Sequence, residues 1–74
     1  VVQGIIDVYW QEGDVLYLLD YKTDRVGQED GEEVLRRRYR AQLDYYAQAL
    51  TQATGLAVKG RVLYSFALGR EVPL

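Results

Sequence analysis

The chain has 74 residues and a formal net charge of −2, so it is one small domain or part of one. Such a chain buries only about 60% of its unfolded surface, which excludes a large internal active-site cavity. Hydrophobic residues make up 49% and charged residues 27%, a mixture typical of folded rather than disordered chains. Cysteine and histidine are absent, which excludes disulfides, thiolate or histidine metal sites and Ser-His catalysis within this sequence.

Two strands joined by a tight turn are predicted first. Val1–Gln11 is an apolar run rich in β-branched and aromatic residues, which favours a strand. Val15–Thr23 predicts a second strand, and its nearly continuous hydrophobicity indicates that both of its faces are covered. The Gly-Asp sequence at 13–14 predicts a type II′ hairpin in which Glu12 pairs with Val15.

A long helix follows a polar loop over residues 24–31. We expect it to run from about Glu32 to Thr54, because Asp30 followed by Glu33 resembles a capping box and Gly55 resembles a C-cap. Apolar side chains recur along one face at three- and four-residue steps. They are Leu35, Tyr39, Leu43, Tyr46, Ala47 and Leu50.

A third strand is predicted over Val58–Leu68, which alternates around Val62 and Tyr64. Gly69 and Pro73 weaken the strand pattern beyond it. A strand, a long helix and another strand form a right-handed crossover, so the second and third strands should be parallel. The predicted fold class is therefore α/β, with the order β-β-α-β.

Three charged residues lie within the first two predicted strands, and they are Asp7, Asp20 and Lys22. Asp20 and Lys22 are two apart and project from one face of their strand. The hairpin register places Asp7 opposite Asp20, where two like charges repel each other unless positive charge lies between them. Lys22 and a divalent cation such as Mg²⁺ would supply that charge. The alternative is that Asp20 caps the strand end and Asp7 pairs with a neighbouring cation.

The same residues carry a resemblance to a nuclease family. Gly4-Ile5-Ile6-Asp7 stands thirteen residues before Asp20-Tyr21-Lys22-Thr23-Asp24, and Gln42-Leu43-Asp44-Tyr45-Tyr46 has the spacing Gln-x-x-x-Tyr. The segment at 61–70 resembles a closing strand. In this order the motifs resemble the C-terminal PD-(D/E)xK nuclease domain of AddA/RecB-type helicase–nucleases over nearly the whole chain. The closing strand is more similar to AddA, although a RecB-type parent stays open.

The resemblance implies a truncated restriction-endonuclease-like core that hydrolyses DNA phosphodiester bonds with Mg²⁺, or with Mn²⁺ as the alternative. Asp7, Asp20 and Lys22 would be the catalytic residues. Asp7 and Asp20 would bind the metal together with the main-chain carbonyl of Tyr21. Gln42 and Tyr46 would lie beside the site and help to position DNA.

The resemblance also implies that residues 1–74 are a partial nuclease domain of a larger double-strand-break repair protein, an expectation that the absence of Met supports. The partners would be DNA, the helicase domains of the parent chain and a partner subunit of the AddB/RecC type. Exposed sheet edges favour self-association. The family often takes a further ligand, a histidine, from a preceding helix, so we expect the isolated chain to be inactive. No apolar run reaches the roughly 20 residues of a membrane span, and we expect a cytoplasmic location.

Two other functions stay open on the sequence. A nuclease fold without catalysis would serve DNA binding or subunit contact. A small nuclease of the CRISPR-adaptation type would share the fold, although such proteins usually carry cysteines for an iron–sulfur cluster. Four arginines in the first turns of the helix fit either phosphate contact or a solvated face with acidic partners four residues away. They are Arg36, Arg37, Arg38 and Arg40.

Overall fold

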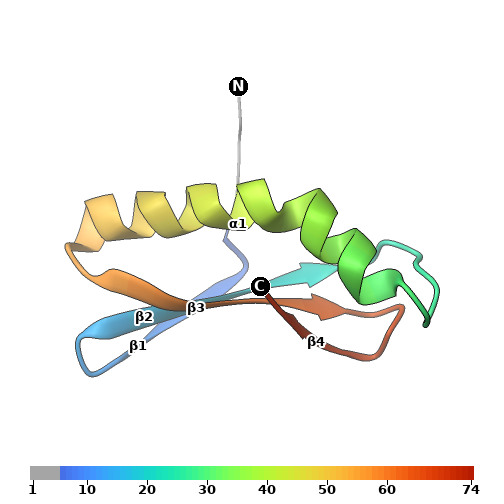
Figure 1. Ribbon diagram of the computed structural model, residues 1–74. Coiled ribbons are helices and arrows are strands. Elements are labelled where there is room, and N and C mark those ends of the chain that lie inside the picture. The colour runs from blue at the N-terminus through green and yellow to red at the C-terminus, as the bar shows by residue number, and fades with distance from the viewer. Residues whose placement is uncertain (1–5) are drawn as a thin grey trace.

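The computed structural model describes residues 6–74, in which one long helix crosses a single face of a four-stranded mixed sheet (Figure 1). The helix is α1 (Gly31–Thr54). The strands, in their order across the sheet, are β1 (Val8–Glu12), β2 (Val15–Lys22), β3 (Ala57–Ser65) and β4 (Arg70–Pro73). The α/β class is confirmed. Within the described residues, no helix is long and apolar enough to cross a membrane.

The β1–β2 hairpin has the predicted antiparallel register, from Glu12 opposite Val15 to Val8 opposite Leu19. Gly13 at the first loop position has φ 62°, and no non-glycine residue among those described has positive φ, which is the sign pattern of a II′ turn. Strand pairing stops at Val8, so Asp7 lies just beyond it rather than within the predicted strand. Residues 1–5 of that prediction lie outside the described residues.

Helix α1 begins one residue earlier than predicted and ends where expected. Gly55 takes the left-handed conformation at φ 76°, and its N–H donates to the Thr51 carbonyl at 2.8 Å. The predicted capping box is wrong in its chemistry, because the Asp30 side chain makes no capping hydrogen bond. With ψ near 7°, Asp30 is outside the β-region geometry that aims such a side chain at the helix end.

The core lies between α1 and the face of the sheet that it covers. The buried side chains of α1 are those of the predicted stripe, except that Tyr39 is half-buried. The sheet contributes Leu16 and Leu18 of β2, Leu63 of β3 and Val72 of β4. Strands β2 and β3 run parallel, as the crossover rule predicts.

The other face of β2 is not covered by a second layer within residues 6–74, so the prediction that both faces are covered is wrong for this part of the chain (Figure 1). Aromatic side chains pack against one another there instead. Trp10 stacks on Tyr17 with ring centroids 5.6 Å apart, and Tyr21 stacks on Phe66 at 5.8 Å. This lateral packing accounts for apolar residues at alternate positions that no helix covers.

The predicted third strand is divided in two. β3 ends at Ser65, and a turn with Gly69 at φ 69° reverses the chain into β4, which pairs antiparallel with β3. The sequence pattern does not predict β4, because Gly69 and Pro73 weaken it. Pro73 is tolerated because β4 is an edge strand, where one N–H is not needed for pairing.

Candidate functional site

Asp7 and Asp20 meet where the β1–β2 pairing ends. Asp20 points to the α1 side of β2 and is 3% exposed, whereas Asp7 is exposed. The main-chain N–H of Tyr21 donates to Oδ2 of Asp7 at 3.0 Å, which fixes this carboxylate beside its neighbour. The two acids therefore come together as the hairpin register predicts.

The two carboxyl groups have opposite pKa shifts. Burial raises the pKa of Asp20, and its hydrogen bond with Asp7 raises it further, while Lys22 opposes both effects. The pKa of Asp7 is lowered, first by the hydrogen bond with Asp20 and then by the N–H of Tyr21. Neighbouring carboxylates that cannot both ionise freely behave in this way. The pair is an electrostatic sink for positive charge.

Lys22 lies against the buried acid and bridges to the helix. Its Nζ is 2.8 Å from Oδ2 of Asp20 and donates to Oε1 of Gln42 at 2.8 Å. The side chains of Lys22 and Asp20 are only 15% and 5% exposed, so the ion pair is largely removed from water. A buried pair of this kind is kept only where additional hydrogen bonds satisfy the charges, and Gln42 supplies one.

A second set of residues extends this site, and their connection to the lysine is not predicted by the sequence. Lys22 Nζ lies 4.0 Å from the centroid of the Tyr39 ring. The Tyr39 hydroxyl lies 2.8 and 2.7 Å from the two carboxylate oxygens of Asp24, and Arg38 pairs with the same acid at 2.6 Å. The position of Asp24, two residues after the lysine, is the only signal in the sequence that could have suggested this connection.

The remaining predicted residues are placed differently. Tyr46 is 4% exposed within the hydrophobic core, and its ring lies 6.4 Å from that of Tyr45. Among the described residues, no hydrogen bond joins Tyr46 to Lys22 or to the acids. The ring of Tyr21 is 47% exposed, so only its main chain belongs to this site. The structure thus brings together Asp7, Asp20, Lys22 and Gln42, but not the side chain of Tyr46.

The donor set fits a hard divalent cation that keeps part of its own water shell. No group of three or more His, Cys, Asp or Glu side chains suited to a metal occurs within residues 6–74. Mg²⁺, however, is commonly held by one or two carboxylates, with water and substrate phosphate completing its octahedron. Asp7 and Asp20, together with the main-chain carbonyl of Tyr21, could supply such a partial set of oxygen ligands.

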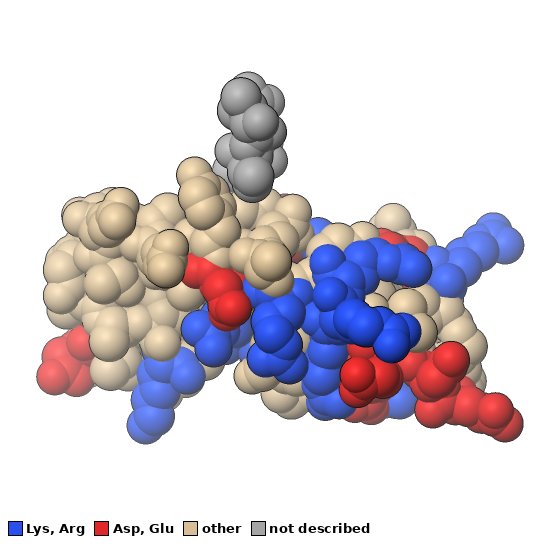
Figure 2. Space-filling model, turned by 45° about the horizontal axis from the view of Figure 1, so that its top comes forward, with Lys and Arg blue, Asp and Glu red and all other residues tan. Residues whose placement is uncertain are grey.

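Basic side chains gather on the half of the molecule where α1 begins, with acidic side chains beside them (Figure 2). Arg36 pairs with Glu32 at 3.1 Å, as the four-residue spacing predicts, and Arg70 pairs with the same glutamate at 2.8 Å. The guanidinium groups of Arg37 and Arg40 are on exposed residues. This surface is therefore only partly neutralised by its own acids.

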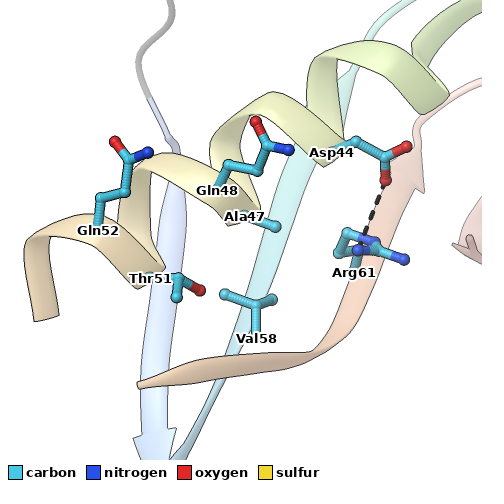
Figure 3. Close-up of a pocket in the computed structure, with 7 residues that line it drawn as sticks. All are labelled: Asp44, Ala47, Gln48, Thr51, Gln52, Val58 and Arg61. Atoms are coloured by element: carbon cyan, nitrogen blue, oxygen red, sulfur yellow. Dashed lines mark ion pairs between the residues drawn. The ribbon is translucent and has the colours of Figure 1, made fainter. Parts of the chain in front are cut away.

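An open groove with a volume of about 710 Å³ lies between α1 and β3 (Figure 3). Its lining is polar along α1, with Asp44, Gln48 and Gln52, and the Asp44–Arg61 pair stands at one end. None of the predicted site residues within the described part of the chain lines it. The groove and the acid–lysine cluster are therefore separate features.

The sequence was also compared with known proteins, and no protein-family model matches it. It is 54% identical, over 72 residues and 97% of this chain, to the AddA subunit of the ATP-dependent helicase/nuclease of Lachnoclostridium phytofermentans. It is 45% identical, over the whole chain, to the proteins of the same name from Clostridium novyi and Bacillus velezensis.

The chain spans only 5 to 6% of the length of these relatives. Their names agree with the AddA type that the motifs resemble. The similarity therefore relates this chain to one short part of much larger helicase/nuclease proteins.

Proposed function

We propose that this chain is the catalytic part of a restriction-endonuclease-like nuclease domain, within a helicase–nuclease that processes DNA double-strand breaks. The observation that carries the proposal is the cluster of Asp7, Asp20 and Lys22, in which two acids converge and the lysine lies 2.8 Å from the buried one. The names of the relatives support the same class of activity. The reaction would be hydrolysis of DNA phosphodiester bonds.

The proposed cofactor is Mg²⁺, held by Asp7, Asp20 and the carbonyl of Tyr21. When bound, it would polarise a phosphodiester oxygen and make its bound water more acidic. Asp20 would be ionised in that state, because a cation beside the pair reverses the cost of burying its charge.

Lys22 would orient the attacking water and offset the negative charge that develops on the phosphate. Its preorganisation comes from Asp20 and Gln42, which each take one direction of the ammonium group. A lysine fixed in this way needs little reorganisation during the reaction.

The proposed partners follow from the relatives and the surface. DNA would be the substrate, and Arg37 and Arg40 would offer exposed positive charge to its phosphates. Helicase domains of the same polypeptide and a second subunit of the AddB/RecC type would deliver the strand. Self-association of the isolated chain through its sheet edges is proposed as a secondary property.

A segment exchange tests the proposal. The matching 72 residues of the Lachnoclostridium relative are replaced by those of this chain, and Mg²⁺-dependent DNA degradation is measured beside ATP-dependent unwinding. We expect degradation to persist in the chimera and to fall at least ~100-fold in its Asp20→Ala and Lys22→Ala forms, as loss of preorganised charge predicts. Unwinding should not change. The matched control is Asp14→Ala, in the exposed turn, which should keep full activity.

Degradation that is unaffected by Asp20→Ala would instead support the alternative of a non-catalytic module for DNA binding or subunit contact. A metal titration separates the two readings at the residue level. Mn²⁺ should broaden the NMR carboxylate signals of Asp7 and Asp20 selectively, and Asp20→Ala should abolish the effect. Equal broadening at Asp44, in the groove, would contradict a specific site.

A further inference from the structure

We propose that Tyr39 is a positioning residue for the Lys22 ammonium and that Asp24 and Arg38 hold its ring in place. The inference rests on the proposed function, because the position of Lys22 matters for catalysis only if Lys22 acts on the phosphodiester. It adds residues of the α1 surface and of the loop after β2 to a site otherwise built from two strands and Gln42.

The first step is the contact between the ammonium group and the ring. Lys22 Nζ lies 4.0 Å from the Tyr39 ring centroid, well within the distance at which a cation is attracted to an aromatic face. Asp20 and Gln42 occupy two other directions around the same nitrogen, each at 2.8 Å. Three different groups therefore surround the ammonium, and together they confine a long side chain that otherwise has several rotatable bonds.

The second step concerns what fixes the ring. The Tyr39 hydroxyl is within hydrogen-bond distance of both oxygens of Asp24, at 2.8 and 2.7 Å. Arg38, the preceding residue of α1, pairs with the same carboxylate at 2.6 Å. The pKa of Asp24 is lowered, chiefly by the Tyr39 hydroxyl and further by Arg38, so this carboxylate stays ionised as an acceptor.

The third step is the connection that these contacts make. Asp24 follows β2 by two residues, whereas Arg38 and Tyr39 belong to α1. The bonds therefore tie the segment after β2 to the helix, next to the strand end that carries the lysine. A tyrosine that only filled the core would need neither the cation at its face nor the acid at its hydroxyl. Both ends of Tyr39 are occupied, as a support for Lys22 requires.

The test uses the chimera in two variants that separate the ring from its hydroxyl. Tyr39→Leu removes the aromatic face, and we expect kcat for DNA hydrolysis to fall about tenfold with little change in KM, because mispositioning of a reacting group acts on the chemical step. Tyr39→Phe keeps the ring, so it should retain most of kcat and lose only a few-fold. Tyr45→Leu, on an exposed residue of the same helix, is the matched control and should leave kcat unchanged.

An NMR measurement on the 74-residue chain tests the geometry without any need for activity. The ring should shift the Lys22 Hε signals upfield in the native chain and in Tyr39→Phe, and this shift should be lost in Tyr39→Leu. A Tyr39→Leu chimera that keeps kcat within about twofold, or Hε signals without an upfield shift in the native chain, would overturn the proposal. An inactive native chimera would overturn the proposed function instead, while the Hε shift would still report on the position of Lys22.

Discussion

Two acid–base pairs lie on the side of the sheet that α1 covers, and they differ in almost every physical respect. Lys22 and Asp20 are 2.8 Å apart, with side chains 15% and 5% exposed. Arg61 and Asp44, beside the groove, are 3.5 Å apart, with side chains 34% and 51% exposed. The first pair gives up hydration and is held by Gln42 and Tyr39 as well, whereas the second stays largely in water.

The comparison indicates which pair the fold is built around. Removing charges from water costs several kcal/mol per ion, so a buried pair is weak evidence for stability and stronger evidence for function. Exposed pairs contribute about 0–1 kcal/mol and need no functional explanation. Asp20 carries the further burden of Asp7 beside it, which stability alone would not favour.

The largest expected effect comes from breaking the buried pair. Lys22→Met leaves the ionised Asp20 without its cation, and we expect the free energy of unfolding at pH 7 to fall by about 3 kcal/mol. Urea denaturation followed by circular dichroism measures the change. The control is Lys59→Met on an exposed lysine of β3, which should change stability by less than about 0.5 kcal/mol. Equal losses in the two variants would contradict the special position of Lys22.

A smaller effect concerns pH, and it has opposite signs at two carboxylates. The pKa of Asp20 is raised by burial, so the folded state binds its proton more tightly than the unfolded state does. Its contribution to stability therefore increases as the pH falls through the raised folded pKa towards the ordinary value of 3.8. The pKa of Asp24 is lowered by Tyr39 and Arg38, so its contribution is present above 3.8 and is lost as the pH falls further.

Each acid is compared with its own asparagine variant by urea denaturation between about pH 3 and pH 7. Relative to Asp20→Asn, the native chain should gain stability on acidification. Relative to Asp24→Asn, it should lose stability. Curves of the same sign would show that one of the two local environments is not as described.

Much of this site followed from the sequence because it depends on β periodicity. The two-residue turn at Gly13 set the hairpin register, and that register alone brought Asp7 beside Asp20. Alternation along β2 then placed Lys22 on the same face as the buried acid. Gln42 was recognised from its motif, and the structure shows its contact with the lysine.

Other parts could not be predicted, because they depend on contacts between distant segments. Tyr39 satisfies a helical apolar stripe equally well whether its ring meets leucines or an ammonium group, so its periodicity hides its partner. The β3–β4 hairpin was missed because Gly69 and Pro73 mark a turn and an edge strand only once the neighbouring strand is known. Tyr46 was assigned to the site by spacing, but the packing of α1 places it in the core.

The smallest expected effect concerns the exposed pair and sharpens the contrast with Lys22. Arg61→Gln removes the cation from Asp44 at the end of the groove, where water can solvate the remaining carboxylate. We expect the free energy of unfolding to fall by less than about 1 kcal/mol and the loss to shrink in roughly 1 M salt, because exposed charges are screened. The loss caused by Lys22→Met should persist in the same salt, since its partner is buried. A salt-insensitive loss at Arg61 would mean that the groove shields its charges as the acid–lysine cluster does, and that the groove warrants the same functional test.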